Sequence, residues 1–243
     1  MSIQDLCRRI QPVDISLRGK AQARLDRLTK PLGSLGRLEE LAASYVSITG
    51  EVKPNVPRGV VFTFAADHGV TLEGVSAYPR EVTPQMVLNF LRGGAGVNVL
   101  AKHAGVDVRV VDIGVDYEFG AVPGLLAQKV MKGTNNLAVE SAMTRSQAEQ
   151  AVMIGVELAT EVVREGIGLI GTGEMGIGNT TPSAAITAVM TGRPVADVTG
   201  CGTGIDKSSR QHKIAVIERA LELHRPDMID PLDDQRKVGG LEI

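Results

Sequence analysis

Three short apolar runs, each followed by a glycine-containing turn and a helix-like segment, constrain the fold of this chain most. The runs occupy residues 60–65, 106–113 and 166–170. A continuous apolar run of this length is typical of a strand that is buried on both faces. Strands that alternate with helices predict a parallel sheet with helices on both sides. We therefore expect an α/β fold that binds ligands at the carboxyl ends of its strands.

Helical periodicity and end signals predict the segments between and around these runs. Ser34 is expected to cap a second N-terminal helix, and Thr144 with Gln147 forms a capping box. Thr181 followed by Pro182 has the sequence of an N-cap and a first helical residue. The predicted helical segments are residues 17–49 with a break at 31–34, 84–91, 95–103, 144–164, 181 onward and 207–224.

The glycine-rich run at residues 171–182 carries the strongest indication of a ligand. Its four glycines and three threonines predict exposed backbone N–H groups at the start of a helix, which is how proteins hold phosphate. A plain turn between strand and helix is the alternative, but four glycines exceed what a turn needs. Glu174 would repel a phosphate, so we expect it to act on another part of the ligand. The run predicts a phosphorylated small molecule and a catalytic or orienting Glu174.

A dinucleotide-binding interpretation of the same run is weaker. Gly171, Gly173 and Gly176 match the fingerprint of dinucleotide sites, and Asp197 follows at about the usual distance. The predicted helix begins too late, however, and Glu174 stands where the pyrophosphate would approach. A nicotinamide-dependent oxidoreductase is therefore disfavoured.

A second glycine cluster at residues 199–206 precedes Lys213 by about two helical turns. Lys213 could fold back over the same anion or be a solvated helix lysine, and Arg210 leaves the same two interpretations open. Asp67 and His68 follow a predicted strand, where bracing of the loop is favoured over acid–base chemistry. No nucleophile elbow lies nearby, so a hydrolase triad is disfavoured.

Composition excludes several classes of function. The net charge of −2, the 3% aromatic content and the absence of Trp argue against nucleic-acid binding. No apolar run has the length of a membrane span, and no signal peptide is visible. Cys7 and Cys201 lack disulfide or metal spacing, and no His, Cys and carboxylate cluster suggests zinc. We expect a cytoplasmic protein with no metal, no cofactor, and no nucleic-acid or membrane partner.

Four motifs occur in the order in which one enzyme family carries them. The motifs are Lys-Pro-Leu-Gly-Ser-Leu-Gly at 30–36, Ala-Asp-His-Gly-Val at 66–70, Gly-Glu-Met-Gly-Ile-Gly-Asn-Thr-Thr at 173–181 and Thr-Gly-Cys-Gly-Thr-Gly at 199–204. On these motifs, the chain resembles nicotinate-nucleotide–dimethylbenzimidazole phosphoribosyltransferases, which build the lower-ligand nucleotide of cobalamin. The resemblance covers nearly the whole chain.

The resemblance implies a fold and an assembly. The expected fold is a doubly wound, mainly parallel sheet with helices on both faces and a small helical subdomain, and the expected assembly is a homodimer. Residues 1–50 would be N-terminal helices that belong to the helical subdomain. Residues 51–243 would form a Rossmann-like α/β domain that is incomplete at its C-terminal side.

The implied reaction moves 5-phosphoribose from nicotinate mononucleotide to 5,6-dimethylbenzimidazole and gives α-ribazole 5′-phosphate and nicotinate. The bound nicotinate is a pyridinium that becomes neutral as it leaves, so the step needs no general acid. A carboxylate such as Glu174 suits the stabilisation of the oxocarbenium-like ribosyl centre. The resemblance places the nucleotide on Gly176, Thr180, Gly202 and Lys213, and the benzimidazole on Ser76, Tyr78, Gln85 and Met175.

The resemblance has one departure. The family's principal base is a glutamate in a C-terminal Leu-Gly-Glu-Gly segment, whereas this sequence stops at residues 238–243, which resemble the first turn of a helix. Glu242 is not expected to replace that glutamate. We therefore expect weak nucleotide binding and poor turnover from the 243-residue form. A nucleotide-binding relative without catalysis is the alternative.

Overall fold

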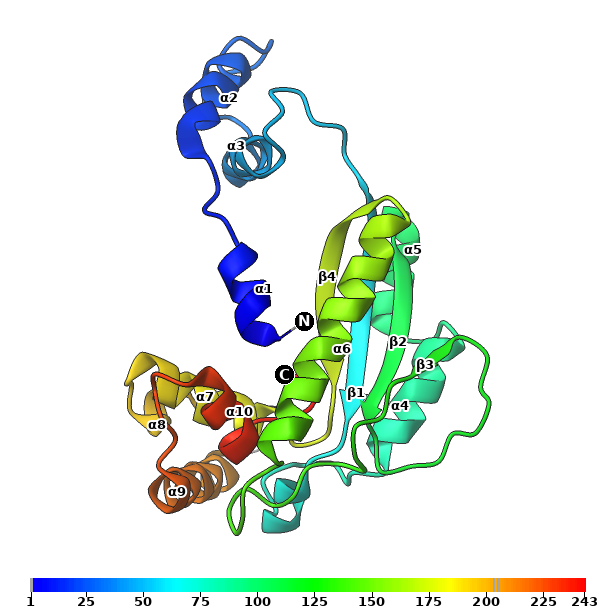
Figure 1. Cartoon of the computed structure of the whole chain (residues 1–243), viewed down its shortest axis with the longest axis vertical. Helices are drawn as coiled ribbons and strands as arrows, with labels where there is room; N and C mark the ends of the chain where they lie inside the picture. The colour runs from blue at the N-terminus through cyan, green and yellow to red at the C-terminus, as the bar shows by residue number, and fades with distance from the viewer. Residues whose placement is uncertain (1, 203, 205) are drawn as a thin grey trace. The chain divides into compact units, whose positions relative to one another are not determined.

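The computed structural model of the protein describes residues 2–202, 204 and 206–243 (Figure 1). The chain divides into two compact units, Met1–Pro57 and Arg58–Ile243. The boundary expected at residue 50 falls within the first unit, near its end. Thr203 and Ile205, which belong to the second glycine cluster of the sequence, lie outside the described residues.

The first unit consists of short helices. Ala21, Ala43 and Val46 form its small core, and Lys30 pairs with Glu39 across the turn at 2.7 Å. The expectation that Ser34 caps a helix is wrong, because the cap position is Gly36, whose positive φ of 53° turns the chain instead. The elements are α1 (Ile3–Arg9), η1 (Ile15–Leu17), α2 (Arg18–Leu25) and α3 (Arg37–Thr49).

The second unit contains a four-stranded, all-parallel sheet in the order β3-β2-β1-β4. The predicted strands at residues 60–65 and 106–113 are confirmed, and β3 was not expected. The third predicted strand also exists, but it continues through the glycines as far as Met175. The strands are β1 (Arg58–Ala66), β2 (Asp107–Gly114), β3 (Leu125–Ala127) and β4 (Ile167–Met175).

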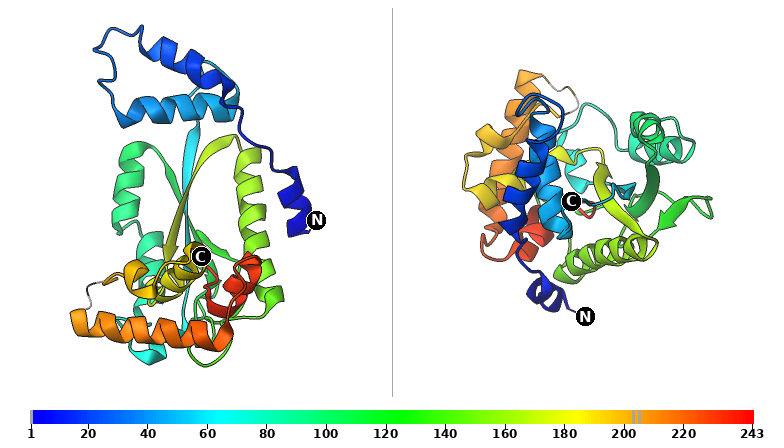
Figure 2. Two further views of the ribbon diagram at one scale, coloured as in Figure 1. Left: turned by 90° about the vertical axis from the view of Figure 1, so that its left-hand side faces the viewer. Right: turned by 90° about the horizontal axis from the view of Figure 1, so that it is seen from above.

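Helices cover both faces of this sheet, as Figure 2 shows from above. Because side chains alternate along a strand, Val111 packs with the helix α6 on one face, whereas Val110 packs with α4 on the other. The α/β fold class is therefore confirmed. The helices are η2 (Gly69–Glu73), α4 (Val82–Leu91), α5 (Gly96–Ala104), α6 (Arg145–Arg164), α7 (Thr180–Thr191), α8 (Val195–Val198), α9 (Lys207–His224) and α10 (Pro231–Val238).

Of the helix ends predicted from local sequence signals, one is confirmed and others are wrong. The capping box of Thr144 and Gln147 opens α6 as expected. Thr181 is not the N-cap of α7, because the helix already begins at Thr180 and Asn179 occupies the cap position without a side-chain cap. Residues 239–243 are not helical, so the expected helical turn there is wrong.

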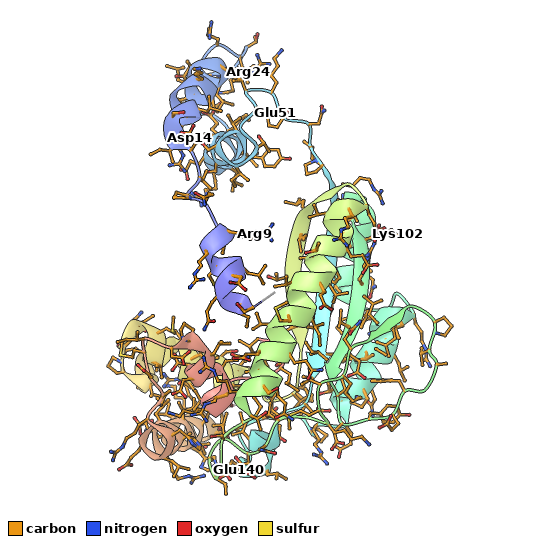
Figure 3. All side chains as sticks on the ribbon, in the orientation of Figure 1. Arg9, Asp14, Arg24, Glu51, Lys102 and Glu140 are labelled. Carbon is orange, nitrogen blue, oxygen red and sulfur yellow. The ribbon has the colours of Figure 1, made fainter. Side chains whose placement is uncertain are left out.

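The parallel strands bring their carboxyl ends to one edge of the sheet. In Figure 3, Glu140 marks this edge and Lys102, on α5, lies toward the other edge. Helices α7, α9 and α10 gather beside the carboxyl edge, where α7, α9 and the end of α10 share a small apolar core (Figure 1). Within the described residues, no helix is both long and apolar enough to cross a membrane.

Candidate active site

A pocket with several polar side chains lies where β1 and β4 end side by side. The register pairs Phe64 with Glu174 and Ala65 with Met175, so both strands deliver their last residues to the same place. The pocket combines the loop after η2, the end of β4, the start of α7, and α9. Its lining residues are Val75, Ser76, Glu174, Met175, Gly176, Ile177, Gly178, Asn179, Thr180, Cys201, Gly202 and Lys213.

The structure brings together most of the residues that the sequence singled out. Glu174, the four expected nucleotide-binding residues, Ser76 and Met175 line this one pocket. Tyr78 is half exposed and Gln85 lines a neighbouring cavity with Arg80 and Tyr117. The positions of Tyr78 and Gln85 therefore do not join them to the other seven, and their role in base binding stays a prediction.

The loop between β4 and α7 supplies fewer free N–H groups than the glycine pattern suggested. The N–H of Ile177 donates to Thr83 Oγ1 at 3.1 Å, and those of Asn179 and Thr181 close turns within the loop. In the described part of the chain, the N–H groups of Gly178 and Thr180 make no hydrogen bond. These two donors stand at the positive end of α7, where an anion is stabilised.

Lys213 is the cation of the pocket. Although it is only 1% exposed, its Nζ donates a hydrogen bond to Thr180 Oγ1. Burial lowers the pKa of Lys213 to about 8. Among the described residues, no carboxylate forms an ion pair with it. A buried ammonium without a counterion favours a bound anion, since the anion would offset the cost of burying the charge.

Close approach explains two of the glycines. A side chain on Gly202, whose φ is 53°, would place its Cβ 3.0 Å from Thr180 Oγ1 and 3.6 Å from Lys213 Nζ. A Cβ on Gly176 would lie 2.6 Å from the carbonyl oxygen of Ala66. These two positions therefore keep the backbone close to the polar groups of the pocket.

Glu174 is the carboxylate of the pocket. Neighbouring protein atoms displace water from the Glu174 carboxylate, and this desolvation raises its pKa. The Glu242 carboxylate raises it further, whereas His68 lowers it. The Glu174 side chain is itself exposed to solvent. The pocket thus joins a cation and helix N–H donors with a carboxylate, which suits a ligand that carries a phosphate and develops positive charge elsewhere.

A buried pair beneath the pocket was missed by the sequence analysis. His68 and Glu242 have side chains that are 0% exposed, and His68 Nε2 donates to Glu242 Oε1 at 2.5 Å. Asn179 Nδ2 donates to the same oxygen at 2.6 Å. The favoured bracing role for His68 fits this contact. Glu242 was considered only as a substitute for the family's principal base, and the only local signal for its buried contact is the preceding pair Gly239–Gly240.

Other candidates have structural partners. Arg210 Nε donates to the carbonyl oxygen of Thr199 at 2.8 Å and so braces the second glycine cluster. His212 contacts the carbonyl oxygen of Glu73 at 2.6 Å. Across residues 2–202, 204 and 206–243, no group of three or more His, Cys, Asp or Glu side chains is arranged to hold a metal ion.

Comparisons with known proteins agree on one family. The family model described as "Phosphoribosyltransferase" matches residues 10–243. The nicotinate-nucleotide–dimethylbenzimidazole phosphoribosyltransferase of Geobacter sulfurreducens is 63% identical over 235 residues, which are 97% of this chain and 67% of that protein. This chain belongs to that family. The enzyme of the same name from Geotalea uraniireducens is 58% identical over 241 residues, covering 99% of this chain and 68% of that protein.

Solved structures of the family have the same fold. The crystal structure of CobT from Thermus thermophilus superimposes with a TM-score of 0.88 at 49% sequence identity, covering 93% of this chain and 68% of that one. The chain thus spans about two thirds of the length of the relatives that it matches. Membership of the phosphoribosyltransferase family, expected from four motifs, is confirmed.

Proposed function

We propose that this chain transfers 5-phosphoribose from nicotinate mononucleotide to 5,6-dimethylbenzimidazole, releasing nicotinate and forming α-ribazole 5′-phosphate. The observation that carries the proposal is the single pocket in which Lys213, Thr180 and Glu174 meet. Relatives at 63% and 58% identity bear the name of this activity. Family membership and the set of polar groups in the pocket favour an enzyme over a nucleotide-binding relative without catalysis.

The phosphate end of the nucleotide belongs beside Lys213. The ammonium, the Thr180 hydroxyl and the N–H groups of Gly178 and Thr180 offer donors from two elements. The N-terminus of α7 adds the favourable end of its dipole. Gly176 and Gly202 lack side chains that would separate the backbone from the ligand. We assign the binding of phosphate and ribose to Gly176, Thr180, Gly202 and Lys213.

The ribosyl centre belongs beside Glu174. The bond between C1′ and the pyridinium nitrogen breaks, its electron pair stays with nicotinate, and the ring leaves neutral. C1′ gains positive charge meanwhile, and the ionised Glu174 stabilises that charge. A benzimidazole nitrogen then forms the new bond to C1′, and the proton of the other ring nitrogen passes to solvent water. Glu174 therefore acts most strongly in the transition state.

The base side of the site is proposed on four residues. Ser76 and Met175 line the same pocket as Glu174, which supports their contact with the attacking ring. Tyr78 and Gln85 complete the proposed base-binding set. We also propose a homodimer, on the family resemblance, and a cytoplasmic location, which suits the two exposed free cysteines Cys7 and Cys201.

Nucleotide binding is expected to weaken as the pH rises through about 8. The phosphate is a dianion throughout this range. Below about pH 8 the ammonium form of Lys213 predominates in the free protein, whereas above it a proton must be taken up on binding. The affinity for nicotinate mononucleotide should therefore fall by up to about tenfold per pH unit between about pH 8 and the higher pKa of the complex. Calorimetric titration from about pH 7 to about pH 9.5 measures this fall.

Two controls make this test specific for the proposed substrate. Nicotinate riboside lacks the phosphate and should bind at least about tenfold more weakly at about pH 7, with little pH dependence. Lys213→Met keeps an unbranched side chain that is one atom shorter and carries no charge, and its weaker binding should not change between about pH 8 and about pH 9.5. Equal binding of riboside and nucleotide by the unsubstituted protein would contradict the proposal.

A further inference from the structure

The buried contact between His68 and Glu242 joins three segments under the active-site pocket. His68 follows β1, Glu242 follows α10, and Asn179 precedes α7. Oε1 of Glu242 accepts hydrogen bonds from both His68 and Asn179, at 2.5 and 2.6 Å. Asn179 Oδ1 in turn accepts from Ser183 Oγ at 3.1 Å, within the first turn of α7. The pair is thereby connected to the helix end that we assign to phosphate binding.

The pair also lies directly against the loop that follows Glu174. A Cβ built on Gly176 would lie 2.9 Å from His68 Nε2 and 3.1 Å from Glu242 Oε1. On the other side, a Cβ on Gly240 would lie 2.6 Å from His68 Cε1 and 2.9 Å from Glu242 Oε2. Glycines on both sides therefore let an imidazole and a carboxylate occupy the space under the pocket.

A lone carboxylate in this place would disturb Glu174. Two carboxylates that share a site resist ionising together, so the charge of Glu242 raises the pKa of Glu174. A protonated Glu174 could not stabilise a ribosyl cation. The imidazolium of His68 compensates the charge of Glu242. Burial by itself lowers the pKa of His68, but the carboxylates of Glu242, Asp67 and Glu174 together raise it, and the net pKa is raised.

We propose that His68 and Glu242 are positioning residues for Glu174. Together they fix the loop at residues 176–179 and place a charge-compensated pair, in place of a single carboxylate, beneath the reacting centre. This inference rests on the proposed function only for what Glu174 does. The protonation states themselves require no substrate and can be measured in the free protein.

The pair also faces charged groups on neighbouring elements. Asp67, which directly follows β1, raises the pKa of His68. The positive charge of Arg80 in turn lowers the pKa of Asp67. Lys213 approaches the pocket from α9. Substitutions at His68 and Glu242 leave all of these groups unchanged, so differences between such variants report on the pair itself.

The test is a double-mutant cycle of His68 and Glu242 in which the titration midpoint of Glu174 is measured. Its carboxyl carbon is followed by carbon-13 NMR in protein labelled at glutamate, with Glu174→Gln providing the assignment. His68→Gln leaves Glu242 uncompensated, so the titration midpoint of Glu174 should rise by about one pH unit. Glu242→Gln removes the carboxylate that raises the pKa of Glu174, so the midpoint should fall. The double variant removes both charges and should return to within about 0.3 unit of the unsubstituted protein.

If the pair only braces the loop and has no electrostatic role, the titration midpoints of Glu174 in the variants should follow a different pattern. Loss of a brace would shift the midpoint in the same direction in both single variants, or leave it unchanged, and the double variant would be the most disturbed. Either result overturns the proposal. If a variant does not fold, titration of the His68 imidazole in the unsubstituted protein decides instead. A midpoint above 6.5 supports the proposal, and a lower midpoint overturns it.

The same variants separate this inference from the proposed function. Release of nicotinate by the unsubstituted protein tests the transfer reaction alone. If transfer occurs but the two single variants shift Glu174 in the same direction, only the positioning role fails. If transfer fails and the opposite shifts are seen, the pair acts on Glu174 and the proposed substrate is wrong.

Discussion

Glu174→Gln is expected to lower kcat by about 100-fold or more while changing the dissociation constant of nicotinate mononucleotide by less than about threefold. Glutamine keeps the shape of the side chain but carries no charge. It therefore loses the attraction to positive charge at C1′. That charge is much larger in the transition state than in the bound nucleotide. Rapid-quench measurement of nicotinate formation with saturating dimethylbenzimidazole gives kcat, and calorimetry gives the dissociation constant.

Glu165→Gln is the matched control for this substitution. Glu165 follows α6 and pairs with Arg109 on β2, away from the pocket. It should keep turnover within about twofold of the unsubstituted protein, since it removes the same charge from a surface position. If Glu174→Gln reduced binding and turnover equally, its role would be structural and the assignment to the transition state would be wrong.

Gly176→Ala is expected to disrupt the site through its backbone. The added Cβ would lie 2.6 Å from the carbonyl oxygen of Ala66 and 2.9 Å from His68 Nε2. A carbonyl oxygen of β1 cannot rotate away as a flexible side chain does, so the loop itself must move. We expect nucleotide affinity and turnover to fall together, by at least about tenfold, and unfolding free energy to fall by about 1–3 kcal/mol.

Gly155→Ala serves as the control for the added methyl group. Gly155 lies within α6, and a Cβ there would meet no atom within 4 Å. The substitution should stabilise the protein by roughly 0.5–1 kcal/mol, because alanine is the better helix former, and should leave binding unchanged. Urea unfolding and calorimetry measure both effects. Unchanged nucleotide binding by Gly176→Ala would contradict the close packing of the loop.

Features encoded locally were predictable from the sequence. The strands β1 and β2 follow from continuous apolar runs, and the start of α6 follows from the capping box of Thr144 and Gln147. The pocket was predictable because parallel strands bring their following loops to one edge. Glu174, Gly176 and Thr180 come from one short segment and needed no long-range information to be grouped.

The course of β4 depended on tertiary contacts. Glycine is a poor strand former, so Gly171 and Gly173 suggested the end of a strand. In the structure they pair with Val61 and Thr63 of β1. A Cβ on Gly171 would lie 3.1 Å from Val61 Cγ2, and one on Gly173 would lie 3.1 Å from the carbonyl oxygen of Phe62. Pairing and close packing against β1 thus overrule the local preference.

The contact of His68 with Glu242 could not be read from the sequence. The two residues are 174 positions apart, and only the completed fold brings them together. The sequence around His68 does not indicate Glu242 as its partner, and the sequence around Glu242 does not indicate His68. Residues 238–243 resembled the first turn of a helix, and nothing in that pattern indicates that the Glu242 side chain is fully buried. Prediction of buried ion pairs of this kind requires the three-dimensional path of the chain.

The most direct test of the central claim is a complete transfer assay with the 243-residue protein. Nicotinate mononucleotide and 5,6-dimethylbenzimidazole are incubated with the protein, and nicotinate and α-ribazole 5′-phosphate are quantified by liquid chromatography and mass spectrometry. We expect the two products in equal amounts, formed only when both substrates are present and strongly reduced in Glu174→Gln. Tight binding of the nucleotide with no α-ribazole 5′-phosphate would contradict the claim.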